Sequence, residues 1–346
     1  MCSLRRWKGW GWTMPSWSRD RVAEEVTTFL WEQWTQLGLA GVSPRRDRWA
    51  IDPEALLLLG LRIAGADPRL FGETLDWLRC NGRLISAKRL RNLARDAESR
   101  RLADAALAWA GMHEPALQLW ARGVPRPASR DELIPLADLS VREPDPAFAS
   151  FGLSWQKTEP SRKSAAADVL RPVALAFRLR LLFGVGARAE VVRYLLTTDR
   201  PESSVAEVAH AAGFGKRNVA DALRALASAG VVWWISRGNE HRFAIDATRW
   251  IGFLQVDADE LPRAVDWVGL LPVVWRIMRW FDEDAATERS PYLRASEARL
   301  VMVEIGPELA AGGIAVPDGR DAHGEAYWPV FENVLEAVFA FLNPTA

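Results

Sequence analysis

The segment SVAEVAHAAGFGKRNVADALRALASAGVVWWISRGNEHRF, residues 204–243, holds the strongest local signals in this chain of 346 residues. Ser204 and Glu207 form a capping box, the S-x-x-E pattern that satisfies the first free N–H groups of a helix. This helix is short, because Gly213 ends it as glycines commonly do. A tight turn follows, and the apolar spacing then predicts a longer helix over residues 216–229.

A two-stranded hairpin is expected to follow the longer helix. VVWWIS and RFAI are short β-prone runs, and Gly238 and Asn239 lie at the tip between them. Upstream, residues 187–198 carry apolar residues at helical spacing, which predicts one more helix. Three helices and a hairpin in this order are the layout of a winged helix-turn-helix, in which residues 236–242 would be the wing.

The longer helix is expected to read DNA. In a winged unit this helix can lie in the major groove, with residues near its N-terminus meeting base edges. Lysine and arginine suit guanine or phosphate, and asparagine suits adenine. The alternative is a solvated charged face on a unit that binds a protein. The expected DNA contacts on the helix and the wing are Lys216, Arg217, Asn218, Arg224, Arg237, Asn239, His241 and Arg242.

Residues 187–250 resemble the winged helix-turn-helix of bacterial MarR-like and ArsR-like transcriptional regulators. The likeness rests on SVAEVAHAAGFGKRNVADALRALASAGVV and WWISRGNEHRF, and it covers about 64 of the 346 residues. It implies sequence-specific binding of double-stranded DNA, usually by a homodimer. Those families are compact single-domain dimers, whereas this chain has long segments on both sides. It also lacks the cysteine metal sensor of many ArsR-like members, so effector sensing does not transfer.

The charge distribution supports a polyanionic partner for the middle of the chain. Lysine plus arginine equals aspartate plus glutamate overall, 44 against 44. Residues 151–256 hold 15 basic and 9 acidic side chains, whereas residues 257–346 hold 7 basic and 16 acidic ones. A basic middle can meet nucleic acid, and the acidic end should stay away from it.

The fold is expected to be mainly α-helical and to contain several domains. The predicted parts are a Trp-rich basic tail (1–18), an N-terminal helical domain (19–121), a Pro-rich connector (122–163), the winged unit (164–256) and an acidic C-terminal helical domain (257–346). The tail is either incidental or a docking segment. The last helix, residues 332–342, is either a dimer surface or a cap on its own domain.

A second candidate DNA contact lies in the N-terminal domain. Ser86 can cap a helix that bears Lys88, Arg89, Arg91, Asn92 and Arg95, of which the first four are the candidate contacts. This domain is expected to contain three helices, and the last of them is basic at its start. The winged unit has the same order of helices, but here no clear wing follows. The alternative is an ordinary helical bundle with a solvated basic face.

Nothing in the sequence indicates catalysis, a metal or a cofactor. Two cysteines, Cys2 and Cys80, cannot build a disulfide framework or a zinc cluster, which fits a reducing cytoplasm. None of the four histidines lies in a metal motif, and there is no nucleophile elbow. No apolar run approaches the ~20 residues that span a bilayer. We therefore expect a cytoplasmic bacterial regulator that does not bind membranes.

Two other functions remain open at this point. The winged unit could be a protein-binding scaffold, for instance in a toxin–antitoxin or defence complex. The chain could also be an enzyme whose site lies between domains and is made of unremarkable residues.

Overall fold

The computed structural model describes residues 17–41, 48–287 and 289–344. The protein is mainly helical, as predicted, and its strands form two small sheets. The N-terminal helices are α1 (Arg19–Gln36), α2 (Pro53–Arg62), α3 (Pro68–Asn81), α4 (Ala87–Leu93), α5 (Ala97–His113) and α6 (Pro146–Ala149). The middle holds α7 (Leu175–Phe183), α8 (Ala187–Thr197), α9 (Val205–Ala212), α10 (Lys216–Ser228) and α11 (Ala247–Leu254). The last helices are α12 (Trp267–Ala285), α13 (Pro291–Ala311) and α14 (Trp328–Leu342).

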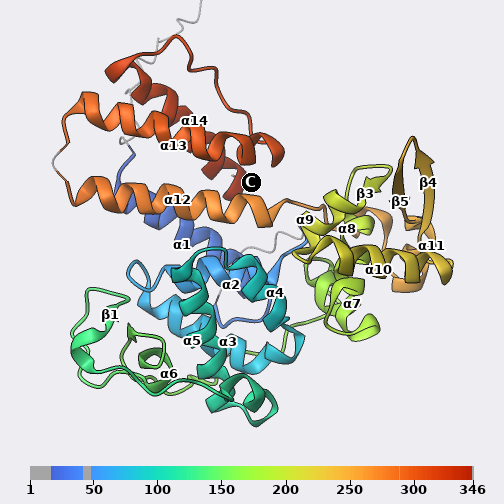
Figure 1. The fold of residues 1–346 in the computed structure, drawn as a ribbon, viewed down its shortest axis with the longest axis horizontal. Coiled ribbons are helices and arrows are strands. Elements are labelled where there is room, and N and C mark those ends of the chain that lie inside the picture. Colours follow the sequence, from blue (N-terminus) through green and yellow to red (C-terminus); the bar gives the residue numbers. More distant parts are fainter. Residues whose placement is uncertain (1–16, 42–47, 288, 345–346) are drawn as a thin grey trace, which may run out of the picture.

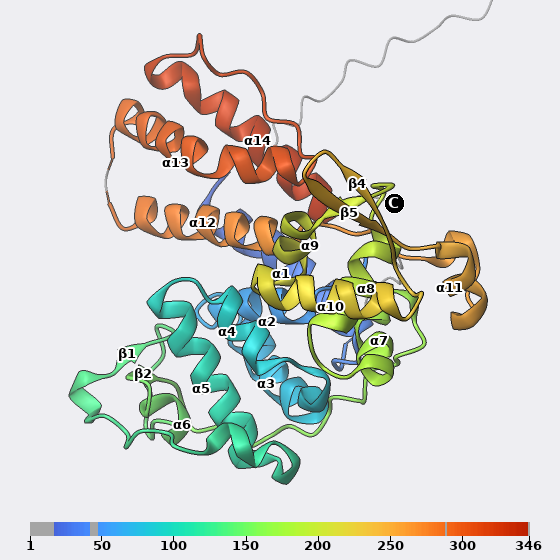
Figure 2. The same cartoon turned by 45° about the vertical axis from the view of Figure 1, so that its right-hand side comes forward.

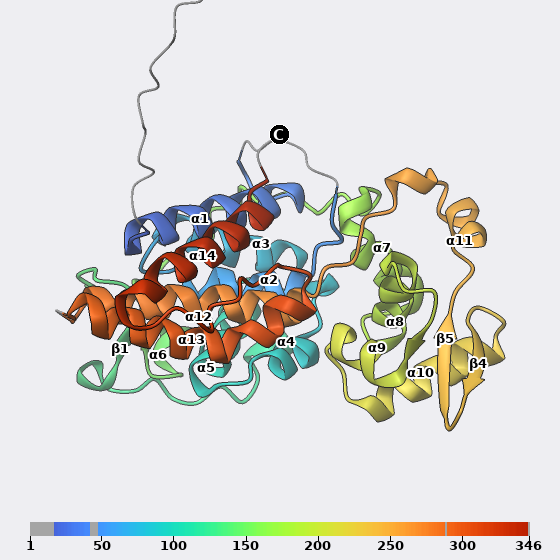
Figure 3. The ribbon, with the colours of Figure 1, turned by 90° about the horizontal axis from the view of Figure 1, so that it is seen from above.

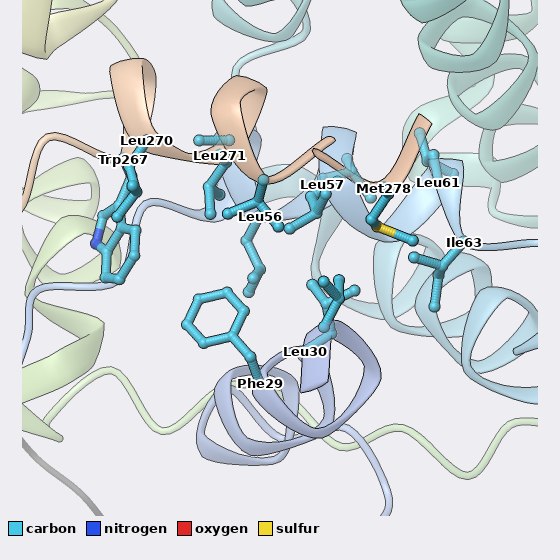
Figure 4. Packing of buried hydrophobic residues seen from close by; sticks show 14 of the residues in the cluster. Phe29, Leu30, Leu56, Leu57, Leu61, Ile63, Trp267, Leu270, Leu271 and Met278 are labelled. Carbon is cyan, nitrogen blue, oxygen red and sulfur yellow. The ribbon is translucent and has the colours of Figure 1, made fainter. Parts of the chain in front are cut away.

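The larger hydrophobic core joins both ends of the chain. Helix α2 is apolar nearly all round and lies between α1, α5 and α12. Phe29 and Leu30 of α1, Leu57 of α2 and Leu271 of α12 meet in this core (Figure 4). Burying a leucine or phenylalanine side chain stabilises a fold by about 1.5–3 kcal/mol, so contacts of this kind hold the helices together.

The acidic segment from residue 257 is therefore not packed as a domain of its own. Helices α12, α13 and α14 share one continuous core with residues 17–177, which differs from the predicted boundary between an N-terminal and a C-terminal domain. Helix α14 buries Phe331, Val334, Leu335 and Val338 within the chain. These residues cap the protein's own core, so the interpretation of this face as a dimer surface is wrong. We call residues 17–174 and 267–344, where described, the body.

The proline-rich connector is also part of the body. Its strands β1 (Ile134–Pro135) and β2 (Leu153–Ser154) pair in parallel. Phe148 of α6 and Trp155 pack against Phe71 of α3, with ring centroids 5.7 and 4.5 Å from that ring. The connector thus packs locally, as predicted, and it contributes buried aromatic side chains to the larger core.

The predicted Trp-rich tail lies mostly outside the described residues, which begin at Trp17. Trp17 itself is buried and stacks on Phe339 of α14, with ring centroids 4.9 Å apart. The guanidinium of Arg21 lies over the same indole ring. This end of the tail is therefore anchored to the body.

A smaller core lies beside the body, in residues 175–256, which we call the small unit (Figures 1 and 3). It contains α7 to α11 and a sheet of three strands, β3 (Ser203–Ser204), β4 (Trp233–Arg237) and β5 (Glu240–Ala244), in the order β3-β5-β4. The predicted start at residue 164 differs from this boundary. The backbone N–H groups of Ala165 and Ala167 donate to Gly38 and Asn81 of the body, and α7 begins only at Leu175.

Six buried charged side chains join the body to the small unit. Three carboxylates and three guanidinium groups take part, and they belong to Asp52, Glu54, Glu190, Arg89, Arg180 and Arg193. Arg180 of α7 donates to Glu54 of α2 at 2.7 and 2.8 Å and to Glu190 of α8 at 2.6 and 2.9 Å. Arg89 of α4 donates to both carboxylate oxygens of Asp52 at 2.5 Å. We call these six residues the charge network.

Four members of the charge network, Asp52, Glu190, Arg89 and Arg180, stay ionised although they are buried. Burial by itself would raise the pKa of Asp52, but the guanidinium of Arg89 outweighs it and holds that pKa well below its usual range. Burial likewise opposes ionisation of Glu190, yet Arg180 and Arg193 lower its pKa to about 2. The pKa values of Arg89 and Arg180 are raised by the same carboxylates despite burial. Three positive and three negative charges therefore balance one another.

Removing one arginine from the charge network should destabilise the protein strongly. Arg180→Ala leaves Glu54 and Glu190 with an uncompensated buried charge, and breaking a buried ion pair in this way costs about 3–5 kcal/mol. Urea unfolding followed by tryptophan fluorescence measures this loss. The matched control is Arg279→Ala, which removes an exposed pair with Glu283 and should cost about 0–1 kcal/mol. Equal losses in the two variants would contradict the role given to the network.

Candidate nucleic-acid interface

Helices α9 and α10 meet at a tight turn whose geometry follows from its residues. The predicted capping box is present: Ser204 accepts from the N–H of Glu207, and the Glu207 carboxylate accepts from the N–H of Ser204. Gly213 ends α9 with φ of 66°, a conformation that favours glycine. A Cβ at Gly213 would also lie 3.0 Å from the Arg89 side chain. Both requirements make glycine the suitable residue at this turn.

Helix α10 has a buried face and an exposed face. Its residues Val219, Ala222, Leu223 and Leu226 are buried in the small core, in line with their predicted spacing. Lys216, Arg217 and Asn218 occupy its first turn and are all exposed. None of these three side chains has an ion pair among the described residues. Their charge and hydrogen-bonding groups are therefore available to a ligand.

The hairpin β4–β5 forms the predicted pair of strands. The strands are antiparallel, with Trp234 opposite Phe243 and Arg237 opposite Glu240, and the turn has Gly238 and Asn239 at its tip. Asn239 and His241 are exposed. The His241 ring lies against Trp234, with ring centroids 4.5 Å apart. The hairpin lies at the edge of the small unit (Figure 3).

The predicted arginines of the hairpin are paired with carboxylates. Arg237 forms a close ion pair with Glu202, and Arg242 pairs with Glu207 at 3.0 Å and with Glu240 at 3.2 Å. Arg224 of α10 is similarly paired with Asp221, one turn earlier. The sequence does not predict the ion pairs that Glu202 and Glu207 form with the hairpin arginines. Any anion that uses them has to displace a carboxylate.

The second set of predicted DNA contacts lies on α4, and the structure divides it. The prediction that Arg89 contacts DNA is wrong, because its side chain is fully buried in the charge network and its Nε donates to the Ala212 carbonyl at 2.6 Å. Asn92 is exposed and donates to the Gly213 carbonyl at 3.2 Å. Arg91 is paired with Asp104 at 2.7 Å, whereas Lys88 is exposed and has no ion pair among the described residues.

The structure therefore brings α4 close to the start of α10, but not to the hairpin residues of the first predicted set. Helix α4 packs on the C-terminal end of α9 and on the turn that leads into α10. Figures 1 and 2 both show α4 beside the N-terminal end of α10. Arg95, which follows α4, is also exposed and lies close enough to His210 of α9 to lower its pKa. Arg95 is predicted on the same helix as Lys88 and Arg91 but is not among the predicted DNA contacts, although it continues their helical spacing.

A histidine contact holds α9 to the body at another point. His210 Nε2 lies 2.8 Å from a carboxylate oxygen of Asp266, the N-cap residue of α12. This hydrogen bond raises the pKa of His210, and the charges of Asp266 and Glu308 act in the same direction. Burial and Arg95 act against it. The contact links the orientation of α9 and α10 to the protonation of one ring.

The body contains a groove where an enzymatic site, the other function left open by the sequence, would have room. It has a volume of about 1380 Å³ and lies between α1, α2, α5, α12 and the 134–139 segment. Among its carboxylates, Asp67 caps α3 and accepts from Trp31, and Asp282 is paired with Arg19. Asp20, Glu24 and Glu98, the acidic residues that line the groove nearby, are exposed. Acid–base catalysis usually needs carboxylates in a shielded setting, which these exposed groups do not have.

Two further features concern metals and membranes. In residues 17–41, 48–287 and 289–344, no three or more His, Cys, Asp or Glu side chains are grouped so that they could hold a metal ion. Over the same residues, every helix is too short or too polar to cross a bilayer.

Comparison with known proteins gave no relative. No family model matches the sequence, and neither a curated protein nor a solved structure matches it. What the surface of α4, α10 and the hairpin binds is therefore inferred from its own residues.

The contact between His210 and Asp266 should make stability depend on pH. Because the folded protein raises the pKa of His210 above its usual value of 6.5, the contact stabilises the fold below that value and is lost as the pH rises through the raised pKa. His210→Ala should therefore destabilise the protein more at about pH 5.5 than at about pH 9.

Thermal unfolding at the two pH values measures this difference. The control is His241→Ala, since the His241 ring contacts Ser236 and Trp234 on the hairpin. If His210→Ala cost the same stability at both pH values, the ion pair with Asp266 would not be the stabilising contact.

Proposed function

We propose that this protein is a sequence-specific DNA-binding transcriptional regulator and that the small unit acts as a winged helix-turn-helix. Helix α10 enters the major groove, and residues 236–242 contact the backbone or the minor groove. One observation carries this proposal: Lys216, Arg217 and Asn218 lie together on the first turn of α10, all of them exposed. Residues of these types at the start of such a helix can hydrogen-bond to guanine and adenine edges.

The arrangement around α10 supports this function. The buried face of α10 is fixed in the small core, so its first turn is held at the surface in a defined orientation. The basic surplus of residues 151–256 favours a polyanion. The expected homodimer, the bacterial origin and the cytoplasmic location are part of the same proposal.

The basic experiment is binding of duplex DNA by the full chain, measured by fluorescence anisotropy. Fragments from the promoter next to the protein's own gene are compared with unrelated duplexes of equal length. Phosphate contacts are strongest at low salt, where non-specific binding is tighter than the Kd of ~10⁻⁴–10⁻⁶ M that is typical at physiological salt. Absence of binding at low salt would contradict the proposal.

Arg217→Ala should weaken binding to the preferred sequence by about 1–3 kcal/mol and relax base preference at one position, because Arg217 would contact a base edge. Anisotropy titrations with a set of single-base variants of the preferred site measure both effects. The matched control is Arg249→Ala, an exposed arginine on α11, which lies at the opposite end of α10 (Figures 1 and 2). A uniform loss for all duplexes would mean that Arg217 contacts phosphate alone.

Glu202→Gln should strengthen DNA binding about two- to fivefold. The substitution removes a negative charge beside the wing and releases the exposed Arg237, and a surface pair of this kind is worth about 0.2–1 kcal/mol. Salt titrations of affinity measure the change. Glu143→Gln is the control, since it breaks an exposed pair with Lys157 in the connector. Unchanged affinity in the Glu202 variant would indicate that the wing arginines do not contact DNA.

One observation favours protein binding as a second candidate function. An apolar groove of about 910 Å³ lies between α7, α11 and β4. Leu182, Trp233 and Phe253 line it, and their exposed fractions are 48%, 48% and 61%. Exposed apolar patches of this kind often mark protein contacts. Co-purification of a stoichiometric protein partner, with no affinity for DNA, would select this function over the first.

A further inference from the structure

We propose that the DNA-contacting surface extends beyond the small unit onto α4 of the body and the residues that follow it, where Lys88 and Arg95 contact phosphates next to the groove that α10 enters. This inference rests on the proposed function and identifies a second part of the same site. The surface of Lys88, Arg95, Lys216 and Arg217 is called the composite basic surface below.

The position of α4 is set by direct contacts with the α9–α10 turn. Asn92 donates to the carbonyl of Gly213, three residues before Lys216. A Cβ at Gly213 would also lie 3.0 Å from Leu93, so the two segments approach as closely as glycine permits. Lys88 precedes Asn92 by four residues, which places both on one face of the helix. Lys88 thus lies on the side of α4 that faces the turn before α10.

The charges on this surface are free to meet an anion. Lys88, Arg95, Lys216 and Arg217 are all exposed, and none has an ion pair among the described residues. Arg91 lies beside them but is paired with Asp104. On this surface, the exposed cations without an ion pair therefore lie on the first turn of α10, on α4 and directly after α4. The two arginines of the hairpin, in contrast, are paired with glutamates.

Duplex DNA fits this distribution better than a small anion does. A helix in the major groove is flanked by phosphates on both strands, and residues beside it fix the protein's register on the duplex. Lys88 and Arg95 lie on α4 and directly after it, beside the larger core, whereas Lys216 and Arg217 lie on α10 of the smaller core, and a duplex offers phosphates to both segments at once. Arg89 anchors α4 through Asp52 and the Ala212 carbonyl, so Lys88 is positioned before DNA binds. Such preorganisation lowers the entropic cost of binding.

The test compares salt dependence of duplex binding in three full-length proteins. The variant Lys88→Ala/Arg95→Ala should lower the slope of log K against log salt by about 1.8, or about 0.9 for each lost phosphate contact. Its affinity at about 0.1 M salt should fall by roughly tenfold or more, equally for all sequences. The matched control, Lys163→Ala/Arg126→Ala, removes two exposed cations from the connector and should leave slope and affinity unchanged.

The outcomes separate this inference from the proposed function. If the wild-type protein and the control bind DNA, Arg217→Ala binds weakly, and Lys88→Ala/Arg95→Ala matches the wild type, then the extension onto α4 is overturned and the regulator proposal stands. If the wild type binds no duplex at low salt, both proposals fail. Circular dichroism and the thermal unfolding midpoint establish that the double variant is folded, which is expected because both side chains are exposed.

Discussion

The buried charge network is the constraint on which the arrangement of this protein depends. Asp52 and Glu54 lie at the start of α2 in the body, and Arg180 and Glu190 lie on α7 and α8 of the small unit. The partners have to meet, because an unpaired charge in such a place costs several kcal/mol. If the contact between the small unit and the body were apolar and of similar area, the two parts could shift against each other at a small cost in free energy. Bidentate pairs between guanidinium and carboxylate groups tolerate far less displacement, so they fix one orientation of the small unit on the body.

This orientation is what brings α4 and α10 together. Arg89 is a member of the network, and its Nε also donates to the last turn of α9. The same side chain therefore neutralises carboxylates in the body and holds the helix that precedes the turn into α10. Asn92 and His210 add contacts on either side of this point. Because the body contacts α9 and the turn into α10 at three places, the small unit cannot be treated as an independent module on a flexible connection.

Much of the small unit could be predicted from the sequence, because its signals are local. The capping box at Ser204, the end of α9 at Gly213 and the buried spacing of Val219 and Leu223 depend on neighbours within a few residues. Contacts between distant segments could not be predicted in this way. The shared core of α1, α2 and α12 joins residues more than 200 positions apart, and helical periodicity does not identify the partner of an apolar face. Arg89 could have been suspected, since it lies four residues before Leu93, an apolar residue on the same helix face that packs against the larger core.

The difference between local and distant contacts also explains why counting charged residues could not locate the candidate DNA-binding surface. Formal counts treat Arg217 and Arg242 alike, yet Arg217 is unpaired among the described residues and Arg242 is paired with three glutamates. An unpaired cation at the surface keeps its full attraction for phosphate. A paired arginine has to give up its carboxylate first, so it gains only the difference in free energy between its contact with phosphate and its contact with the carboxylate. Helices α13 and α14 lie on the far side of α12 from α4 (Figures 1 and 2). A chain that is neutral overall can thus expose unpaired cations on α4, directly after it and on the first turn of α10, while many of its carboxylates lie on other helices.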